Sequence, residues 1–463
     1  MTTPPLSPLR RDLRLVLAEG VAFSIMVGGG ESYLAAFVLA LGLGEVASGL
    51  IATVPLLAGG ILQMLTPYGV ARVGTRRRWA VICAAWQAAS FVPLIVGGLR
   101  GTMPAWLVFA AAASYWAAGM AIAPAWNAWV EHLVPRPIRN AYFATRTGAA
   151  QAAVVVGLIG GGVVLQQAAE RGAPMFGFVL LFAVAAAARG ASAVLLGAQS
   201  ERGARVPDEA VRPALPLLRR MPSGPGARLL FYLLGLTAAA TIASPFFSPY
   251  MLAQLELSYE RYMILVAASL AGKVVVFPAL PPLARRFGLR WLLRVAWIGI
   301  VPSPLLWLIS DAYPYLLAIQ IVSGVAWAAH EYASFLLLFE MVEARRRVAI
   351  LTTYNLVHAI ATVGGSTLGA AILQGKGGGP EAYWAIFAVS GAARLLAVLL
   401  LARVPAIRGE PSPMWFRPIA VRPAAGFVLR PILATVRRRR RAEEASATVP
   451  RDGDGSPGSG SAG

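Results

Sequence analysis

Glu31, Lys273, His330 and Glu331 are ionisable side chains that interrupt long apolar stretches of this sequence. An ionised group at the centre of a lipid bilayer costs roughly 2.5 to 3.5 kcal/mol on insertion scales, so a membrane protein keeps one where it faces water, another charge or a ligand. Carboxylates and histidine bind and release protons, and lysine neutralises a carboxylate or an anionic ligand. These residues are therefore the first candidates for binding a proton or a charged substrate.

Each candidate also has a structural interpretation. Glu31 follows three glycines, Gly28 to Gly30, which loosen a helix and expose its backbone, but a hydrogen-bonded packing carboxylate would fit the same position. Neighbours on a helix point about 100° apart, so His330 and Glu331 form either a site with one member in a cavity or a buried structural pair. Lys273 either neutralises a charge inside the membrane or extends its amine to the membrane surface.

Other side chains in the apolar stretches offer hydrogen bonds or rings to a polar ligand. Trp116 could stack on an aromatic or sugar ring, although tryptophan is also common at membrane interfaces. Asn355 and His358 offer hydrogen bonds. The predicted set for substrate and proton binding is Glu31, His330, Glu331, Lys273, Trp116, Asn355 and His358.

The composition indicates that lipid is the main solvent, because 57% of the residues are apolar, 13% are charged and the mean hydropathy is +0.65. The formal charge of +20 comes from arginines in short runs between apolar segments, which argues against a nucleic-acid partner. One cysteine and three scattered histidines predict no metal site. No nucleotide-binding loop or Ser/His/Asp arrangement is present, so we expect neither a cofactor nor an enzyme.

Apolar stretches of roughly 20 residues predict an all-α membrane protein with twelve spans, near residues 15–40, 46–68, 79–99, 104–131, 142–167, 174–198, 227–252, 258–281, 290–309, 313–340, 348–374 and 381–402. Connections after even-numbered spans are rich in arginine, which predicts cytoplasmic N- and C-termini. The polar residues 199–226 are predicted to link an N-terminal six-helix half (1–198) to a C-terminal one (227–402). Residues 403–463 form a basic cytoplasmic tail whose Gly/Ser-rich end should be disordered.

The two halves show an internal repeat, because Val134–Gln166 recurs without a gap at Val342–Gln374. Each copy is an arginine-rich loop followed by an apolar segment with two glycines four residues apart, and Gly157 matches Gly365. Such glycines let helices approach closely. Duplicated halves of long apolar segments are a recurring plan of secondary transporters.

The ionisable residues of the tenth span are not repeated. His330 and Glu331 correspond to Ile122 and Ala123 in the first half. A duplicated scaffold needs the same packing in both halves, whereas proton chemistry can be built into one. The asymmetry therefore favours a functional role for the tenth span.

A loop motif strengthens this interpretation. Arg72, Gly74 and Arg76 are spaced as R-x-G-x-R after the second span, and Arg286 and Gly288 repeat the pattern after the eighth. Together with the twelve spans, the motif resembles the major facilitator superfamily over about residues 10–403. The resemblance implies two six-helix halves that rock about a central site lined by spans 1, 4, 7 and 10, where Glu31 would be well placed.

The sequence also departs from the family pattern. Pro67 and Ala71 occupy positions where the family typically has glycine and aspartate, which puts the family's usual gate at this loop in doubt. The predicted loop and gate residues are Arg72, Gly74, Arg76, Arg139, Arg286, Gly288 and Arg347.

The sequence thus predicts a monomeric, proton-coupled secondary transporter of a small molecule in the inner membrane of a bacterium, with lipid as its surroundings. Export is slightly favoured, because the tryptophan-bearing apolar spans and the partial glycine pattern of the fifth span fit an amphiphilic substrate. Uptake of a small polar nutrient is an alternative, since it fits the membrane carboxylate and histidine equally well. A second alternative is a membrane sensor or scaffold that uses the same fold without transport.

Overall fold

The computed structural model describes residues 8–201, 225–341 and 347–402. Within those residues, twelve helical spans are long and apolar enough to cross a membrane, which confirms the predicted all-α class and the number of spans. The basic tail and nearly all of the predicted linker lie outside the described residues.

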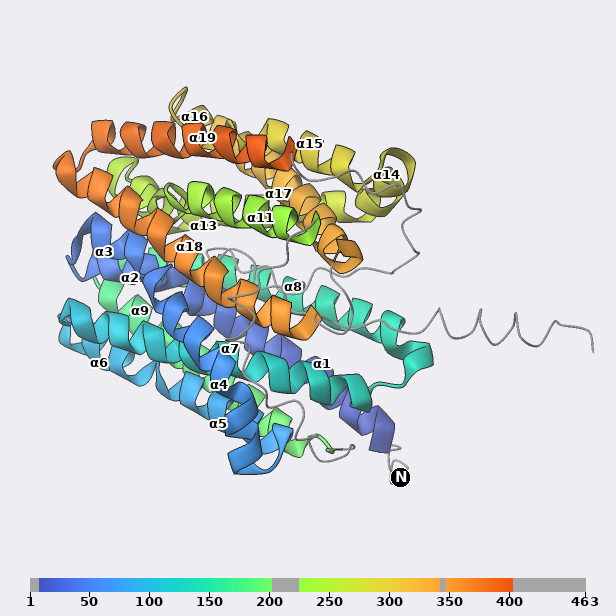
Figure 1. The fold of residues 1–463 in the computed structure, drawn as a ribbon. Coiled ribbons are helices and arrows are strands. Elements are labelled where there is room, and N and C mark those ends of the chain that lie inside the picture. The colour runs from blue at the N-terminus through green and yellow to red at the C-terminus, as the bar shows by residue number, and fades with distance from the viewer. Residues whose placement is uncertain (1–7, 202–224, 342–346, 403–463) are drawn as a thin grey trace, which may run out of the picture. The chain divides into compact units, whose positions relative to one another are not determined.

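Six spans make up the N-terminal half, which is coloured from blue to green in Figure 1. Span 1 consists of α1 (Pro8–Gly29), η1 (Glu31–Tyr33) and α2 (Leu34–Ala40). Span 2 consists of α3 (Gly44–Leu50) and α4 (Val54–Val73), and span 3 of α5 (Arg76–Ala89) and α6 (Val92–Arg100). Spans 4, 5 and 6 are the single helices α7 (Ala105–Leu133), α8 (Arg136–Glu170) and α9 (Pro174–Ala198).

The C-terminal half repeats this order. Span 7 consists of α11 (Pro225–Thr241), η3 (Ser244–Phe246), α12 (Phe247–Pro249) and η4 (Tyr250–Gln254). Span 8 consists of α13 (Tyr259–Val276), η5 (Phe277–Ala279) and α14 (Leu280–Phe287), and span 9 of α15 (Leu289–Ile300) and α16 (Ser303–Leu306). Spans 10, 11 and 12 are α17 (Tyr313–Met341), α18 (Arg347–Gly375) and α19 (Pro380–Ala402).

Spans 1 and 7 are both interrupted part of the way along. In span 1, α1 ends at Gly29 and the 3₁₀ turn η1 begins at Glu31. In span 7, α11 ends at Thr241, and Pro245 and Pro249 lie in the turns that follow, where proline removes a backbone donor. Interrupted helices inside a membrane protein occur where protein or water covers the exposed backbone, and in secondary transporters they adjoin the substrate site.

The repeated glycines bring neighbouring spans together, as predicted. A Cβ atom on Gly157 of α8 would lie 2.9 Å from the backbone nitrogen of Gly29 in α1. A Cβ atom on Gly365 of α18 would overlap the carbonyl oxygen of Ala238 in α11. The same close approach therefore holds span 5 against span 1 and span 11 against span 7.

Replacing Gly365 with alanine is expected to destabilise the protein by about 1 to 3 kcal/mol, because the added methyl group forces α18 away from α11. The measurement is thermal unfolding of the purified protein in detergent. Gly364→Ala is the matched control, since a Cβ atom there would meet nothing within 4 Å. Equal losses in the two variants would contradict the close-packing role.

Arg189 ends the segment FAVAAAAR in span 6, and Arg394 ends the similar segment FAVSGAAR in span 12. Both side chains are buried. Arg189 of α9 donates a hydrogen bond to Gln87 (2.7 Å), and Arg394 of α19 donates to the carbonyl of Ile300 (2.7 Å) and to Ser303 (3.0 Å). These bonds tie spans 6 and 12 to spans 3 and 9, which agrees with an anchoring role.

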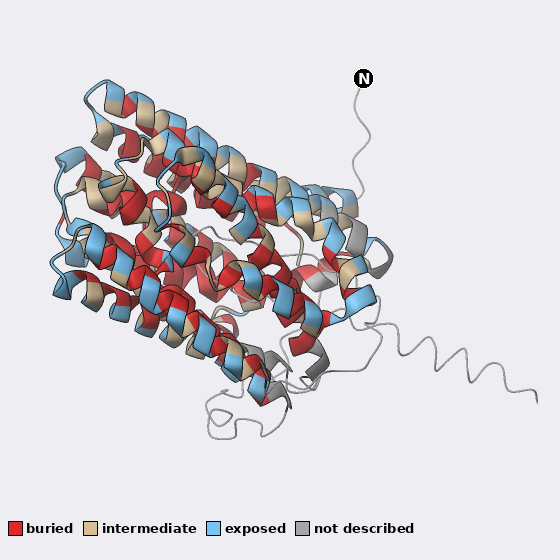
Figure 2. Ribbon diagram, turned by 90° about the horizontal axis from the view of Figure 1, so that it is seen from above, coloured by how far each residue is buried: buried red, intermediate tan, exposed pale blue. Residues whose placement is uncertain are grey.

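The outward faces of the helices are apolar. Val194, Val275 and Ile298 are 73%, 78% and 76% exposed, and the buried residues follow the inner faces of the helices (Figure 2). A large exposed apolar surface on a protein with twelve spans is the surface that lipid covers.

The halves contact each other through span 2 with span 11, span 5 with span 8, and the ends of spans 1 and 2 with span 7. Thr53 of span 2 donates to Ser366 of α18 (2.7 Å), and Phe246 of η3 packs against Gly49 of α3. The helices α2 and α3, which contact span 7, lie at the end of the bundle where the first connection joins spans 1 and 2, on the left in Figure 1.

Candidate functional site

An ion pair joins Lys273 of α13 to Glu331 of α17, with 2.5 Å between Nζ and Oε1. The two side chains are 16% and 12% exposed, so they are mostly covered without being sealed. Two glycines position the pair, because Gly272 faces the backbone of α17 and Gly324 faces the backbone of α13. Mutual neutralisation lowers the cost of keeping both charges inside the membrane, and a proton or a ligand group could replace either partner.

The side chain of His330 has different neighbours from the side chain of Glu331. Its ring lies 5.8 Å from the ring of Tyr232 in α11 and 5.7 Å from that of Trp327 (centroid distances), and its Nε2 atom is 3.3 Å from the hydroxyl of Ser334. The Nδ1 atom is buried and has no hydrogen-bond partner among the described residues. His330 is therefore held by rings and one hydroxyl, with one ring nitrogen left for another group.

Asn355 and His358 lie one turn apart on α18 and are buried. The ring of His358 is 5.7 Å from that of Tyr354. The Oδ1 atom of Asn355 is buried without a partner in the described part of the chain, and so is the Oε1 atom of Gln63 in α4. The helices α4 and α18 pack against each other, with Gly60 facing Leu356 and Ala359.

Glu31 lies in a different environment. It is buried in η1 and accepts a hydrogen bond of 2.5 Å from the hydroxyl of Tyr115 in α7. Tyr115 packs edge-on against Phe91 of span 3 and against Trp116, which is 2% exposed in the same hydrophobic core. The structure thus places both predicted residues within the packing of the N-terminal half, apart from the Lys273–Glu331 pair.

The sequence did not reveal a second charged cluster in the N-terminal half. Glu19 of α1 lies 3.0 Å from Arg146 of α8 and 3.9 Å from Arg189 of α9 (carboxylate to guanidinium). The guanidinium of Arg146 also stacks over the ring of Trp126 in α7, 4.5 Å from its centroid. Arg146 begins the apolar part of span 5, beside an arginine-rich loop, so the sequence alone suggested no role inside the bundle.

The loop after span 2 keeps its tight turn. Gly74 ends α4 with a φ of 89°, a left-handed conformation that favours glycine. The carboxylate of Glu201 accepts hydrogen bonds from the backbone amides of Arg76 (3.0 Å) and Arg77 (3.4 Å) at the start of α5. Glu201 thus brings a carboxylate to this loop, where Ala71 occupies the position at which the family pattern has an aspartate. The side chain of Arg72 is exposed.

The corresponding loop of the second half also turns at a glycine. Gly288 separates α14 from α15 with a φ of 86°, and Arg286 lies over the ring of Phe287. The side chains of Arg139 and Arg347, at the starts of α8 and α18, lie outside the described residues. Within residues 8–201, 225–341 and 347–402, no three His, Cys, Asp or Glu side chains lie close enough to hold a metal ion.

The fold and the charged pairs define a class of protein, namely a multi-pass membrane protein of two repeated six-helix halves with ionisable groups buried inside each. Residues 229–441 match the family model of the Major Facilitator Superfamily. No match was found among curated protein sequences.

Solved structures with the same fold are transporters. The nucleoside transporter NupG has a TM-score of 0.63 at 12% identity, over 86% of this chain and 99% of that one. A POT family transporter in complex with a conjugated peptide has a TM-score of 0.63 at 11% identity, over 85% and 96%. The predicted resemblance to the major facilitator superfamily is confirmed, by the family model for the C-terminal half and by the structures for the whole fold. The matches support a membrane transporter.

A third comparison gives the same fold. A bacterial homologue of the iron transporter ferroportin is 18% identical over 86% of this chain and 99% of that one, and has been solved in two states. The TM-score is 0.64 against its inward-facing state and 0.55 against its outward-facing state. Both comparisons support the same fold of two six-helix halves.

Proposed function

We propose that this protein is a proton-coupled secondary transporter that moves a small molecule across the cytoplasmic membrane of a bacterium by alternating access. The observation that carries the proposal is the Lys273–Glu331 ion pair, which lies inside apolar spans and is slightly exposed. At the repeat position of Glu331 the first half has Ala123, so the scaffold itself does not need the charge.

Coupling is assigned to the carboxylate of Glu331. In one state it pairs with Lys273, and in the other it carries a proton while Lys273 is free to bind a group of the substrate. His330, Asn355 and His358 lie in the same half and offer hydrogen bonds nearby. Glu31, which lies in the interrupted span 1, is a second candidate for proton binding. Its carboxylate accepts a hydrogen bond from Tyr115 of α7.

The halves are joined in a way that permits rocking. Their contacts include single hydroxyl pairs and rings set against glycines, such as Thr53 with Ser366 and Phe246 with Gly49. Such contacts separate without disturbing the helices themselves. In the proposed orientation the arginine-rich connections are cytoplasmic, and the protein works as a monomer. Arg72, Arg76, Arg286, Arg139 and Arg347 then anchor the cytoplasmic loops, with Gly74 and Gly288 at the turns.

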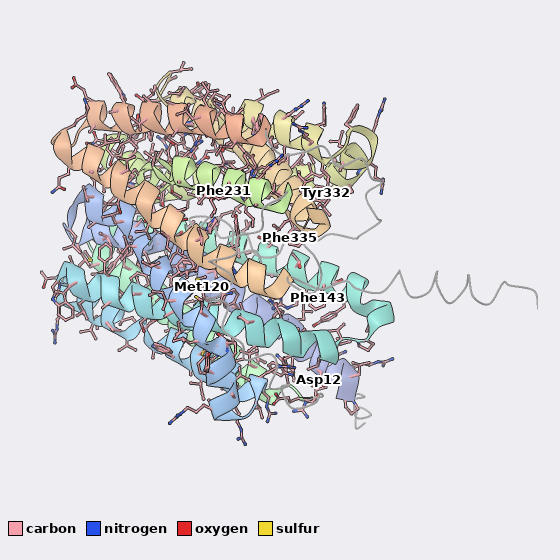
Figure 3. All side chains as sticks on the ribbon, viewed as in Figure 1. Asp12, Met120, Phe143, Phe231, Tyr332 and Phe335 are labelled. Atoms are coloured by element: carbon pink, nitrogen blue, oxygen red, sulfur yellow. The ribbon has the colours of Figure 1, made fainter. Side chains whose placement is uncertain are left out.

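Export is the proposed direction. Trp327 lies beside His330. Phe335, which is labelled in Figure 3, is four residues after Glu331 and so lies one turn further along the same face of α17. Both rings are partly exposed, and aromatic surface beside an ion pair suits an amphiphilic molecule with a polar group. Proteoliposomes preloaded with substrate or with buffer alone measure export and uptake separately.

Glu331→Gln is expected to abolish substrate-dependent proton movement while the protein still inserts and folds. The measurement uses purified protein in proteoliposomes, a pH-sensitive dye inside, and added drugs, sugars and organic acids. Glu381→Gln is the matched control, because that carboxylate is exposed at the start of α19. If no compound produces flux or a pH change with the unaltered protein, the sensor or scaffold alternative replaces transport.

A further inference from the structure

Arg146 in the Glu19 cluster of the N-terminal half has donor capacity beyond its pair with Glu19. Among the described residues, the guanidinium groups of Arg146 and Arg189 both lie against the carboxylate of Glu19. Arg146 uses its Nη2 atom for Glu19 and its Nε atom for the carbonyl of Val16 (3.2 Å). Its Nη1 atom takes part in neither bond, and the side chain is 15% exposed. A partly exposed guanidinium inside a span, with a donor beyond its bonds to Glu19 and Val16, is suited to bind an anionic group.

Trp126 adds a second unused donor at the same place. Its ring lies under the Arg146 guanidinium, and its Nε1 atom is buried without a hydrogen-bond partner in the described part of the chain. The side chain is 5% exposed. Nearby tryptophans are satisfied, because Trp129 donates to the carbonyl of Ser200 and Trp79 to that of Ala121, each at 3.1 Å. A buried N–H group without an acceptor is unfavourable, so this one indicates a missing acceptor.

The duplication shows that packing does not require these donors. At the repeat offset, Arg146 corresponds to Tyr354 and Trp126 to Ser334. Tyr354 is buried in the C-terminal half and packs against His358. A neutral side chain therefore fills the same position in the duplicated scaffold, and the cation and the indole N–H are additions of the first half.

We infer that Arg146 and Trp126 bind the carboxylate or phosphate group of the transported molecule, so that the substrate class is an organic anion. Arginine binds such groups through directional, charge-assisted hydrogen bonds, and the indole N–H supplies a further donor. The inference rests on the proposed transport function and deepens it. An inside-negative membrane potential drives an anion outward, which agrees with export.

An anionic lipid headgroup offers the same chemistry, so the test separates the two sources. The full-length protein is placed in nanodiscs of zwitterionic lipid, and binding of 2-naphthoate and naphthyl phosphate is measured by thermal shift and by calorimetry. The neutral isostere 2-naphthamide serves as the uncharged probe. The same titration is repeated in nanodiscs that contain phosphatidylglycerol.

Binding of the anions at least about tenfold tighter than the amide is expected, with a similar loss in Arg146→Gln and in Trp126→Phe. Trp129→Phe is the matched control and should change affinity less than about twofold, because its N–H group already has an acceptor. Equal binding of anion and amide, or an unchanged affinity in Trp126→Phe, overturns the inference. So does stabilisation by phosphatidylglycerol that soluble anions do not reproduce or compete with.

This test is independent of transport. Anion binding with the expected variant effects but without flux would reject the proposed function and leave the anion site in place. Flux of neutral compounds without anion binding would retain transport and reject the anion site.

Discussion

Replacing Lys273 with methionine is expected to abolish transport and to destabilise the protein by about 3 kcal/mol, because the Glu331 carboxylate loses its partner in mostly buried surroundings. The value is at the low end for a broken buried pair, since the carboxylate is 12% exposed and protonation limits the cost. Thermal unfolding in detergent measures the stability, and proteoliposome flux measures the transport.

The double variant Lys273→Met with Glu331→Gln separates charge from packing. It removes both charges and keeps the approximate size of both side chains, so most of the lost stability should return while transport stays absent. If the double variant is as unstable as Lys273→Met alone, the loss comes from the packing of the lysine stem between α13 and α17. In that case the charge interaction between Lys273 and Glu331 does not stabilise the protein.

The fold could be predicted from the sequence because each of its signals is local. A span needs only length and apolar composition, and the arginine distribution separates the two sets of connections. The repeat was visible because Gly157 and Gly365 stand at matching positions, and their close contacts with α1 and α11 explain the need for glycine.

The contact between Lys273 and Glu331 could not be predicted from local sequence signals. Lys273 and Glu331 were both recognised as exceptional, but their contact depends on the register of α13 against α17, which the glycines Gly272 and Gly324 set. The sequence put His330 and Glu331 together as neighbours, whereas their side chains have different surroundings on α17.

The Glu19 cluster was missed for a physical reason. Arg146 follows an arginine-rich connection, and such arginines usually mark the cytoplasmic surface. Nothing local shows that α8 continues from Arg136 to Glu170 as one helix and so carries Arg146 two to three turns inward, against Glu19. The signal that could have found it was the mismatch with Tyr354 in the repeat.

Removing the carboxylate of Glu45 is expected to loosen the contact between the halves at the end of the odd connections. Glu45 of α3 accepts hydrogen bonds from Gln254 of η4 (2.8 Å) and from Tyr383 of α19 (2.7 Å), so one side chain of the first half holds two spans of the second. Hydrogen bonds to a charged group contribute about 1.5 to 3 kcal/mol each. Glu45→Ala should therefore increase the population open at this end by at least about tenfold.

The measurement uses a cysteine in place of Ser366, which is buried between the halves, in a Cys83→Ala background. Its reaction rate with a membrane-impermeant thiol reagent reports opening, and Glu45→Ala should accelerate it. Glu170→Ala is the matched control, because that exposed carboxylate accepts a hydrogen bond from Gln166 of its own helix and none from the other half among the described residues. An unchanged rate in Glu45→Ala, or an equal increase in Glu170→Ala, would contradict the role of Glu45 in holding the two halves together. Because alternating access requires each end to close in turn, the same variant should also slow transport while leaving anion binding at Arg146 intact.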